Sequence, residues 1–316
     1  MIRNNGKRRP ATDEREEERT VDFGRLLTAM VTPFDDQLQI DWERTARLID
    51  YLIESQRSDG LVIAGTTGES PTLTDEEKLE LFRFAVKQAN GRAKIIAGTG
   101  SNDTAHSIHL SKEAEKIGVD GIMLVSPYYS RTSQDGLLAH FRAIAAEVSL
   151  PIMIYNIPSR TGINIEAKTM LALAETPNVV AVKESSGDLD QMSAILAGAP
   201  SGFRLYSGDD SLTLPVLSIG GHGIVSVTSH LVGRQMKDMI DAHFEGRPAD
   251  AAKLHLQLSP MFKGMFIGPK SRMVNPVPVK YALKRKGIDC GGVRLPLVNA
   301  TLEEAAFLDE LVDAYE

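Results

Sequence analysis

The chain has 316 residues, of which 42% are hydrophobic and 24% are charged, and its formal net charge is −7. These proportions are typical of a globular protein and exclude collagen-like and disordered classes; with no run of ~18 apolar residues, no membrane-spanning helix or membrane partner is expected. The acidic balance argues against a nucleic-acid partner, and the single cysteine, Cys290, excludes an intramolecular disulfide and a multi-thiolate metal site.

The first residues are predicted to form a disordered, charged tail over 1–21. Between Met1 and Thr20 charges of both signs are dense, and the apolar core of a secretory signal is missing. A protein of the reducing cytoplasm is therefore expected.

Short, continuous apolar runs recur from Leu26 onward, and a longer segment of helical period follows each one. Because these runs do not alternate with polar residues, they are typical of strands buried on both faces, as in a parallel sheet. We predict eight such strands, at 26–31, 60–65, 94–98, 121–125, 151–156, 179–183, 203–207 and 223–227.

Helices are predicted between the strands. The helix after the second strand begins at Thr74, and Glu77 lies three residues later, the spacing of a capping box. The next helix, over 102–118, ends at Gly118. The first helix spans 42–55, and its apolar side is expected to hold Trp42, Ala46, Ile49 and Ile53.

Eight β-then-α units in about 200 residues favour a closed (β/α)₈ TIM barrel; an open sheet of eight strands is the alternative. We expect the barrel to span 22–245. The rest of the chain carries more helical pattern than one barrel helix needs. A small C-terminal helical domain is therefore expected over 246–316.

A lysine stands at the C-terminal end of the sixth predicted strand, and strand ends of this kind form the active site of a β/α barrel. Lys183 ends the apolar run 179–183, so its amine is expected to reach the barrel mouth. A desolvated amine becomes available in its neutral, nucleophilic form, and its imine with a ketone is an electron sink. The alternatives are a surface lysine or an ion-pair partner of Glu184.

Hydroxyl groups at other strand ends suit the proton transfers that imine chemistry needs. Tyr155, Thr66 and Tyr129 each offer a donor and an acceptor in one group. The alternative for each tyrosine is a packed aromatic ring. Segment 65–70, GTTGES, adds consecutive backbone N–H groups at a strand-to-helix turn, which suits a carboxylate, although a tight turn with a helix cap uses the same residues.

Two weaker patterns bear on metal binding. His106 and His109 lie three residues apart with no further ligand in view, so they are interpreted as surface residues. Asp209 and Asp210 are interpreted as caps of the following helix rather than as a cation site. Neither a metal nor a separate cofactor is expected.

Seven segments occur in the order found in one known family. They are GTTGES (65–70), SPYY (126–129), YNIPSRTG (155–162), VKESSG (182–187), SGDD (207–210), GGHGIVSV (220–227) and NPVPVKYAL (275–283). Over about 22–300 the chain resembles the dihydrodipicolinate synthase/N-acetylneuraminate lyase family. The resemblance implies a class I (Schiff-base) lyase that uses pyruvate and no cofactor beyond its covalent imine. It also implies a homotetramer built as a dimer of tight dimers.

The resemblance assigns the catalytic roles. Lys183 forms the imine with pyruvate, and Tyr155 is the proton donor and acceptor. Thr66 and Tyr129 complete the proton relay, and Tyr129 is inserted from the neighbouring subunit.

The same resemblance assigns the substrate contacts. Thr67 and the main chain of Val225 hold pyruvate, and Gly208 shapes the pocket. Arg160 binds the carboxylate of L-aspartate 4-semialdehyde, since its planar fork matches a carboxylate. An interface salt bridge is the alternative role of Arg160.

The synthase branch of the family is the closest match, and it implies condensation of pyruvate with L-aspartate 4-semialdehyde to 4-hydroxy-tetrahydrodipicolinate, on the way to diaminopimelate and lysine. Two alternatives stay open. One is a related aldolase acting on a sugar acid or N-acetylneuraminate, because the loops that choose the aldehyde are the least readable part of the sequence. The other is a non-catalytic barrel that binds a small molecule.

Feedback inhibition by lysine is predicted to be weak or absent. Asn102 and Tyr128 match the cleft that lysine-inhibited members of the family use. Asp75 and Lys78 stand where such members often place histidines, and His106 stands where they place a glutamate. The ammonium group of lysine would therefore meet a cation and lose an anion, and one unit charge pair at ~4 Å is worth about 4 kcal/mol at an effective dielectric constant near 20.

Overall fold

Eight parallel strands close into a barrel in the computed structural model, which describes residues 21–268 and 273–315. The strands are β1 (Leu26–Ala29), β2 (Gly60–Ile63), β3 (Lys94–Gly98), β4 (Gly121–Val125), β5 (Ile152–Asn156), β6 (Val179–Glu184), β7 (Arg204–Ser207) and β8 (Gly223–Ser226). All eight lie within two residues of their predicted ends. Leu27 of β1 pairs with Val225 of β8, so the sheet is closed. The predicted (β/α)₈ TIM barrel is confirmed, and the open-sheet alternative is wrong.

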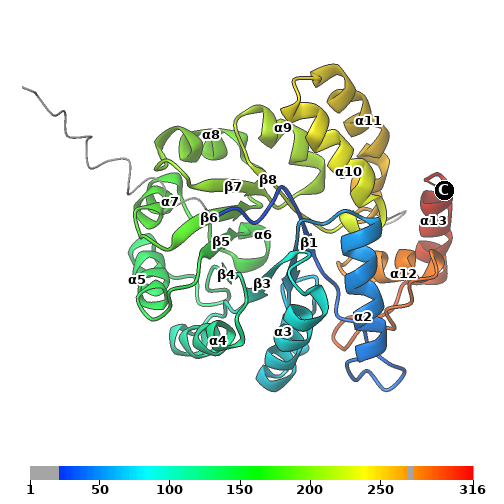
Figure 1. The fold of residues 1–316 in the computed structure, drawn as a ribbon, viewed down its shortest axis with the longest axis horizontal. Helices are drawn as coiled ribbons and strands as arrows, with labels where there is room; N and C mark the ends of the chain where they lie inside the picture. The colour runs from blue at the N-terminus through cyan, green and yellow to red at the C-terminus, as the bar shows by residue number, and fades with distance from the viewer. Residues whose placement is uncertain (1–20, 269–272, 316) are drawn as a thin grey trace, which may run out of the picture.

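Helices surround the barrel (Figure 1). Those between strands are α2 (Trp42–Asp50), α3 (Asp75–Ala89), α4 (Thr104–Ile117), α5 (Gln134–Ala145), α6 (Pro158–Thr161), α7 (Ala167–Ala174), α8 (Leu189–Gly198) and α9 (Thr213–Ser218). They are followed by α10 (Ser229–Phe244), α11 (Pro248–Gly264), α12 (Val277–Arg285) and α13 (Leu302–Asp313). The capping box of Thr74 and Glu77 is confirmed at the start of α3, and Gly118 ends α4 with a φ of 87°.

The first predicted helix differs in extent and in its buried face. α2 ends at Asp50, and a π-helical turn, η1 (Tyr51–Ser55), completes the segment. Trp42, Ala46 and Ile53 are only half-buried, because a polar residue joins the buried face: the hydroxyl of Thr45 donates to the Asp41 carbonyl at 2.6 Å. The fully buried face consists of Thr45, Leu48, Ile49 and Leu52.

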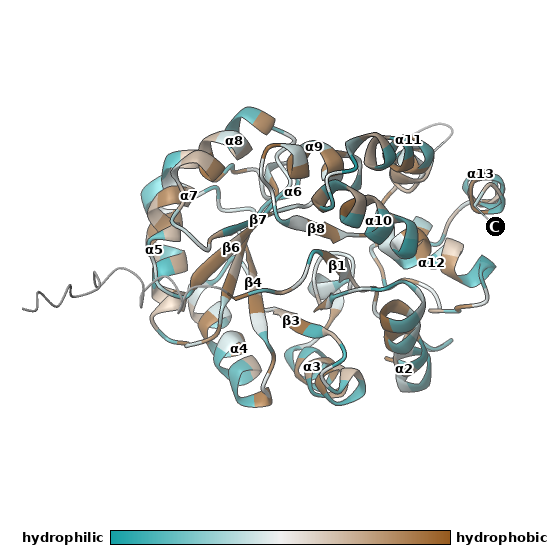
Figure 2. Ribbon diagram, turned by 45° about the horizontal axis from the view of Figure 1, so that its top comes forward, coloured by the Kyte–Doolittle hydropathy of each residue, from teal (hydrophilic) through white to brown (hydrophobic). Residues whose placement is uncertain are grey.

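Each strand buries both of its faces, as its uninterrupted apolar sequence predicts. Side chains such as Val62, Met123 and Met153 fill the interior of the barrel. Their sequence neighbours Leu61 and Ile122 face outward and pack in the layer between strands and helices. Figure 2 shows the resulting hydrophobic strands inside helices whose outer faces are hydrophilic.

The chain before β1 crosses the N-terminal end of the barrel, the end facing the viewer in Figure 1. Phe23 is 1% exposed and packs with the interior side chains, so it fills this end. The hydroxyl of Tyr206 donates to the carbonyl of Gly24 at 3.0 Å and fixes the crossing segment.

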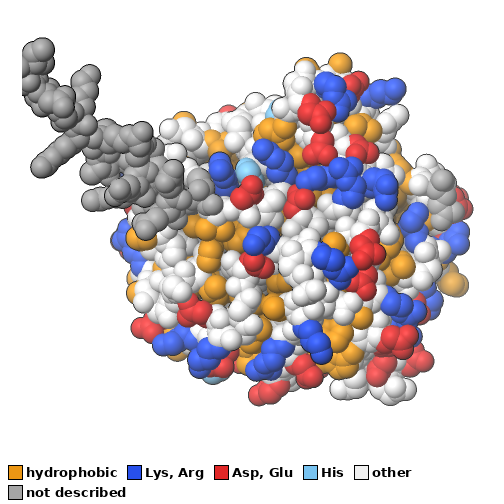
Figure 3. Space-filling view, in the orientation of Figure 1, with side chains coloured by type: hydrophobic (Ala, Val, Ile, Leu, Met, Phe, Trp, Pro, Cys, Tyr) orange, Lys and Arg blue, Asp and Glu red, His pale blue; other side chains and the backbone are white. Residues whose placement is uncertain are grey.

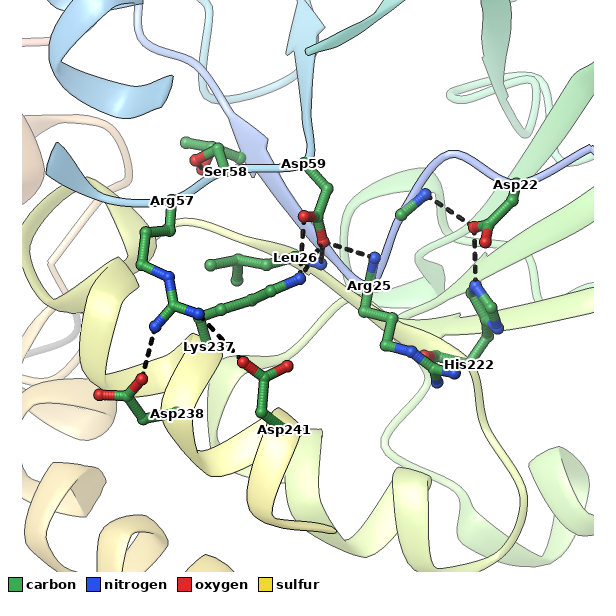
Figure 4. A network of polar contacts seen from close by, with 12 residues as sticks. Asp22, Arg25, Leu26, Arg57, Ser58, Asp59, His222, Lys237, Asp238 and Asp241 are labelled. Carbon is green, nitrogen blue, oxygen red and sulfur yellow. Dashed lines mark hydrogen bonds and ion pairs between the residues drawn. The ribbon is translucent and has the colours of Figure 1, made fainter. Parts of the chain in front are cut away.

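Ion pairs hold the same end together (Figure 4). The carboxylate of Asp59 accepts from the backbone N–H groups of Arg25 and Leu26, at 2.8 and 2.9 Å, and from the Lys237 amine at 2.6 Å. It therefore links β1, the start of β2 and α10. Arg57 adds ion pairs to α10, at Asp238 and Asp241. Acidic and basic side chains lie side by side over the face seen in Figure 3.

A neutral histidine sits inside the junction of β8 and α10. His230 is fully buried; its Nε2 accepts from the Val31 N–H at 3.2 Å, and its Nδ1 lies 2.7 Å from the Val227 carbonyl. Burial lowers the pKa of His230 to about 4. An unfolded histidine titrates near 6.5, so acid protonates the unfolded chain first.

We therefore expect His230 to make stability depend on pH. Its contribution is complete above about pH 6.5 and declines between about pH 6.5 and pH 4, by up to roughly 3 kcal/mol of unfolding free energy. Urea unfolding at about pH 7.5 and pH 4.5 measures this loss, and His230→Gln should show a smaller one. An equal loss in the variant and the parent would rule out this source.

The predicted domain division stays a prediction. α11, α12 and α13 fall within 246–316, beyond the last barrel strand. The predicted tail lies almost wholly outside the described residues, which begin at Val21. Among the described residues, no helix combines the length and the apolar character that crossing a membrane requires.

Candidate active site

Lys183 and Tyr155 lie side by side at the C-terminal ends of β6 and β5. The two residues are partners in the parallel ladder, and the Lys183 Nζ lies 4.1 Å from the centre of the Tyr155 ring. Both are nearly buried, with 5% and 4% of their surfaces exposed. The amine thus lies in an apolar, water-poor setting with one aromatic face beside it.

Neither alternative for Lys183 agrees with this placement. A residue 5% exposed is not a surface lysine. Glu184 follows Lys183 in a strand, so the two side chains point to opposite faces of the sheet. The Glu184 carboxylate accepts from Asn156 Nδ2 at 3.0 Å and from the Ser186 N–H at 2.8 Å, and burial raises its pKa. Within the described ranges Lys183 forms no ion pair.

A cavity of about 1040 Å³ opens at this end of the barrel. Four of the predicted site residues line it: Thr66, Tyr129, Tyr155 and Arg160. The other four, Lys183, Thr67, Gly208 and Val225, do not form its lining. Lys183 contacts the ring of Tyr155, which does line the cavity, and Val225 is fully buried in β8 with its side chain inside the barrel.

Gly208 lies so close to its neighbours that a side chain there would displace them. A Cβ atom there would lie 1.8 Å from the Ser185 Oγ and 3.0 Å from the Lys183 Cε. Any larger residue would push against the stem of Lys183. The structure thus gives a packing reason for glycine beside the lysine.

The β2–α3 loop, residues 64–74, carries the two threonines. Thr66 is half-buried at the cavity, whereas Thr67 is 3% exposed and its Oγ1 accepts from Asn275 Nδ2 at 2.9 Å. Sequence reasoning missed Asn275 as a neighbour of this loop. Its only sequence signal was its place at the head of the segment NPVPVKYAL.

The cavity mouth holds Tyr129 and Arg160. Tyr129 is 92% exposed and has a φ of 73°, in the left-handed region that a bulky residue seldom adopts. Arg160 is exposed in the short helix α6, which follows β5. A tyrosine ring held out in this way is not packed against its own subunit, so the packed-aromatic alternative does not hold for Tyr129.

A polar cluster lines the outer part of the same cavity. The His106 Nε2 lies 2.8 Å from one Asp75 carboxylate oxygen, and the Lys78 Nζ lies 3.8 Å from the other. Lys78 is nearly buried, and desolvation lowers the pKa of its amine. His109 is exposed, and 35% of the His106 side chain is exposed, so both histidines lie at the surface, as interpreted from the sequence. Asn102 and Tyr128 also line this part.

The two adjacent aspartates take different roles. Asp209 accepts from the Ser211 N–H at 2.9 Å and caps the turn η3 (Asp210–Leu212), as predicted. Asp210 is not a cap: it is 2% exposed and accepts from the Ser226 hydroxyl and from the Thr228 N–H, tying β7 to β8. The role of Asp210 could not be predicted from neighbouring residues, because its hydrogen-bond partners lie at least 16 residues away in the sequence.

Comparison with known proteins identifies the family of the chain. The model of the dihydrodipicolinate synthetase family matches residues 22–315. A 4-hydroxy-tetrahydrodipicolinate synthase from Moorella thermoacetica is 58% identical, over 89% of this chain and 94% of that protein.

Solved structures give the same result. A dihydrodipicolinate synthase from Bacillus anthracis has a TM-score of 0.89 and 46% identity, covering 93% of this chain and 98% of its own. A dihydrodipicolinate synthase from Cyanidioschyzon merolae with lysine bound has a TM-score of 0.89 and 44% identity, covering 92% and 98%. The resemblance found in the sequence is therefore confirmed, and the chain belongs to the dihydrodipicolinate synthetase family.

Proposed function

We propose that this chain condenses pyruvate with L-aspartate 4-semialdehyde to 4-hydroxy-tetrahydrodipicolinate, through an imine on Lys183. The chain is a lyase of its family, and relatives above 50% identity over nine-tenths of the chain are synthases of this product. The observation that carries the proposal is the buried amine of Lys183 beside Tyr155, at the C-terminal end of a β/α barrel.

The chemistry follows from the amine. Nitrogen attacks the C2 carbonyl of pyruvate, water leaves, and the protonated imine makes the neighbouring methyl carbon acidic. Loss of a proton gives an enamine, whose carbon attacks the aldehyde. The amino group of the semialdehyde then displaces Lys183 and closes the ring. Because the imine is itself the electron sink, the proposal calls for no further cofactor.

Each of these steps moves a proton, and the hydroxyl groups at the cavity suit that task. In the proposal Tyr155 is the central donor and acceptor, with Thr66 and Tyr129 beyond it. The exposed ring of Tyr129 supports its insertion into a neighbouring subunit. We accordingly propose a homotetramer of tight dimers, acting in the cytoplasm.

In the proposal two groups hold pyruvate beside the amine, and a third residue leaves space for it. Thr67 and the main chain of Val225 contact the substrate, and Gly208 leaves room for the modified Lys183. The close approach of Gly208 to the Lys183 stem supports the last of these roles.

Borohydride reduction in the presence of pyruvate tests the proposal. Intact mass should show one pyruvate-derived adduct per chain, on the peptide that bears Lys183. An unlabelled protein would instead favour the non-catalytic barrel. Turnover with aspartate semialdehyde is then compared with turnover on N-acetylmannosamine, and preference for the sugar would favour the aldolase alternative.

Arg160→Ala is expected to separate the two substrates. Its exposed guanidinium lies at the cavity mouth, away from the buried amine, so labelling by pyruvate should persist. Loss of a bidentate carboxylate contact should raise the KM for semialdehyde by roughly tenfold or more. Equal loss of pyruvate labelling and semialdehyde use would fit an interface role for Arg160 instead. Arg142→Ala, on the outer helix α5, serves as the control.

Lysine should inhibit this chain weakly or not at all. The anion of Asp75 is already engaged by His106 and Lys78, so little negative charge is left for the ammonium group of a lysine ligand. Initial rates across a lysine series measure the effect. Half-maximal inhibition at submillimolar lysine would contradict the expectation, and Lys78→His should increase sensitivity.

A further inference from the structure

Three residues of the C-terminal segment form hydrogen bonds and an ion pair with the β2–α3 loop. We name Asn275, Lys280 and Arg294 the C-terminal clamp. Asn275 donates to Thr67, Lys280 pairs with Glu69, and the Arg294 N–H donates to the same Glu69 carboxylate at 2.9 Å. The clamp thus contacts the loop that carries Thr66 and Thr67 from a segment more than 200 residues away.

The pair of Lys280 and Glu69 is almost completely shielded from water. Their side chains are 3% and 0% exposed, and the Lys280 Nζ lies 2.7 Å from the Glu69 Oε1. The amine also donates to the Gly292 carbonyl at 2.7 Å and lies 4.2 Å from the centre of the Phe34 ring. A buried pair with further hydrogen bonds accepts few geometries, so it fixes the backbone on both sides.

That rigidity acts on a strained stretch of loop. Glu69 has a φ of 58°, in the left-handed region that a residue with a long side chain seldom adopts. Arg294 adds bonds from its guanidinium to the Thr72 carbonyl and to the Glu77 carboxylate, at 2.9 and 2.8 Å. Contacts with the C-terminal clamp therefore stabilise a loop conformation that the backbone preferences of its residues do not favour.

Asn275 acts directly on a substrate contact. Its amide N–H donates to the Thr67 Oγ1 at 2.9 Å, and both residues are buried. With its oxygen engaged as an acceptor, the Thr67 hydroxyl keeps its own hydrogen for another acceptor. The carboxylate of a 2-oxo acid is such an acceptor.

We propose that Asn275 and Lys280 are positioning residues, which hold the β2–α3 loop so that Thr66 and Thr67 meet pyruvate beside Lys183. This inference rests on the proposed function. It adds that the C-terminal segment sets the affinity for the 2-oxo acid without touching it, and that it has little influence on the aldehyde.

Asn275→Ala tests the direct contact. Without Asn275 the Thr67 hydroxyl is no longer oriented toward the pyruvate carboxylate. The pyruvate concentration that gives half-maximal borohydride labelling should therefore rise by about tenfold or more, the effect of losing the hydrogen bond from Thr67 to that charged group. The KM for semialdehyde should change less than about twofold, because Arg160 lies on another element. Asn178→Ala is the matched control, since its amide donates to the Ala145 and Val148 carbonyls at the opposite end of the barrel.

Lys280 is tested in a double variant, because removing one partner leaves a buried charge and endangers folding. Lys280→Met with Glu69→Gln removes both charges together. Half-maximal labelling should again need about tenfold more pyruvate. Lys237→Met with Asp59→Asn, the ion pair at the N-terminal end, should leave labelling unchanged.

The outcomes separate the inference from the proposed function. If the unmodified chain is not labelled, the proposed function fails. If it is labelled but Asn275→Ala shows the parental dependence on pyruvate, the positioning role is overturned. A parental dependence in the Lys280 double variant would likewise limit that pair to stability.

Discussion

Lys183→Ala should give a folded barrel that pyruvate and borohydride no longer label. The substitution removes the amine that lies against the buried Tyr155 ring and that the proposed function uses as the nucleophile, so no imine should form. Turnover should fall by at least roughly 10⁴-fold, because every later step proceeds from that covalent intermediate. Intact mass after reduction and steady-state rates with both substrates measure the two effects.

The matched control is Lys94→Ala. Lys94 also sits on a barrel strand, but at the N-terminal end of β3, where its amine lies 2.8 Å from Asp120 and its side chain is half-exposed. Activity and labelling should be retained. A Lys183→Ala protein that still acquires the adduct would move the nucleophile to another residue and remove the basis of the proposed function.

Tyr155→Phe should lower turnover by roughly 10²-fold or more, since it removes the hydroxyl that the proposed function makes the central proton carrier. The ring stays in place, so the 4.1 Å contact with the Lys183 amine and the packing of β5 are preserved. Labelling by pyruvate should become slower yet still reach one adduct per chain. A time course of reduction, run beside steady-state assays, distinguishes a slower step from a lost site.

Tyr206→Phe provides the comparison for that experiment. Tyr206 is also buried inside the barrel, but its hydroxyl donates to the Gly24 carbonyl at the far end. The substitution should reduce stability and leave the rate almost unchanged. If Tyr155→Phe reduced turnover no more than Tyr206→Phe does, Tyr155 would be a packing residue rather than a proton carrier.

The architecture was predictable because its signals are local and repeated. Each strand could be predicted from a short apolar run. Thr74 and Gly118 indicated helix ends, because the hydrogen bonds of a helix cap join residues only a few positions apart. The first helix was harder. Its buried face includes Thr45, a polar residue. Because the Thr45 hydroxyl donates a hydrogen bond to the Asp41 carbonyl, its burial costs less free energy than that of an unpaired hydroxyl.

The site was predictable only in part. The placement of Lys183 and Tyr155 side by side could be predicted because strand ends converge in a barrel, a rule that needs topology alone. Asn275 and Lys280 were not found, because their partners Thr67 and Glu69 lie 208 and 211 residues away in sequence. Nothing local distinguishes a buried ion-pair lysine from a solvated one. The burial of Asp210 between β7 and β8 escaped for the same reason.

The filled N-terminal end of the barrel bears on the order in which the two substrates bind. In the part of the chain that the structure describes, Phe23 and the interior side chains close the N-terminal end of the barrel, and the cavity opens at the C-terminal end. In the proposed function, pyruvate reaches Lys183 from this cavity, beside Tyr155, before the aldehyde occupies it. The released water and the cyclic product then leave through the same cavity. Entry of both substrates through one cavity is consistent with the proposed order of binding, in which the keto acid comes first and its aldehyde partner second.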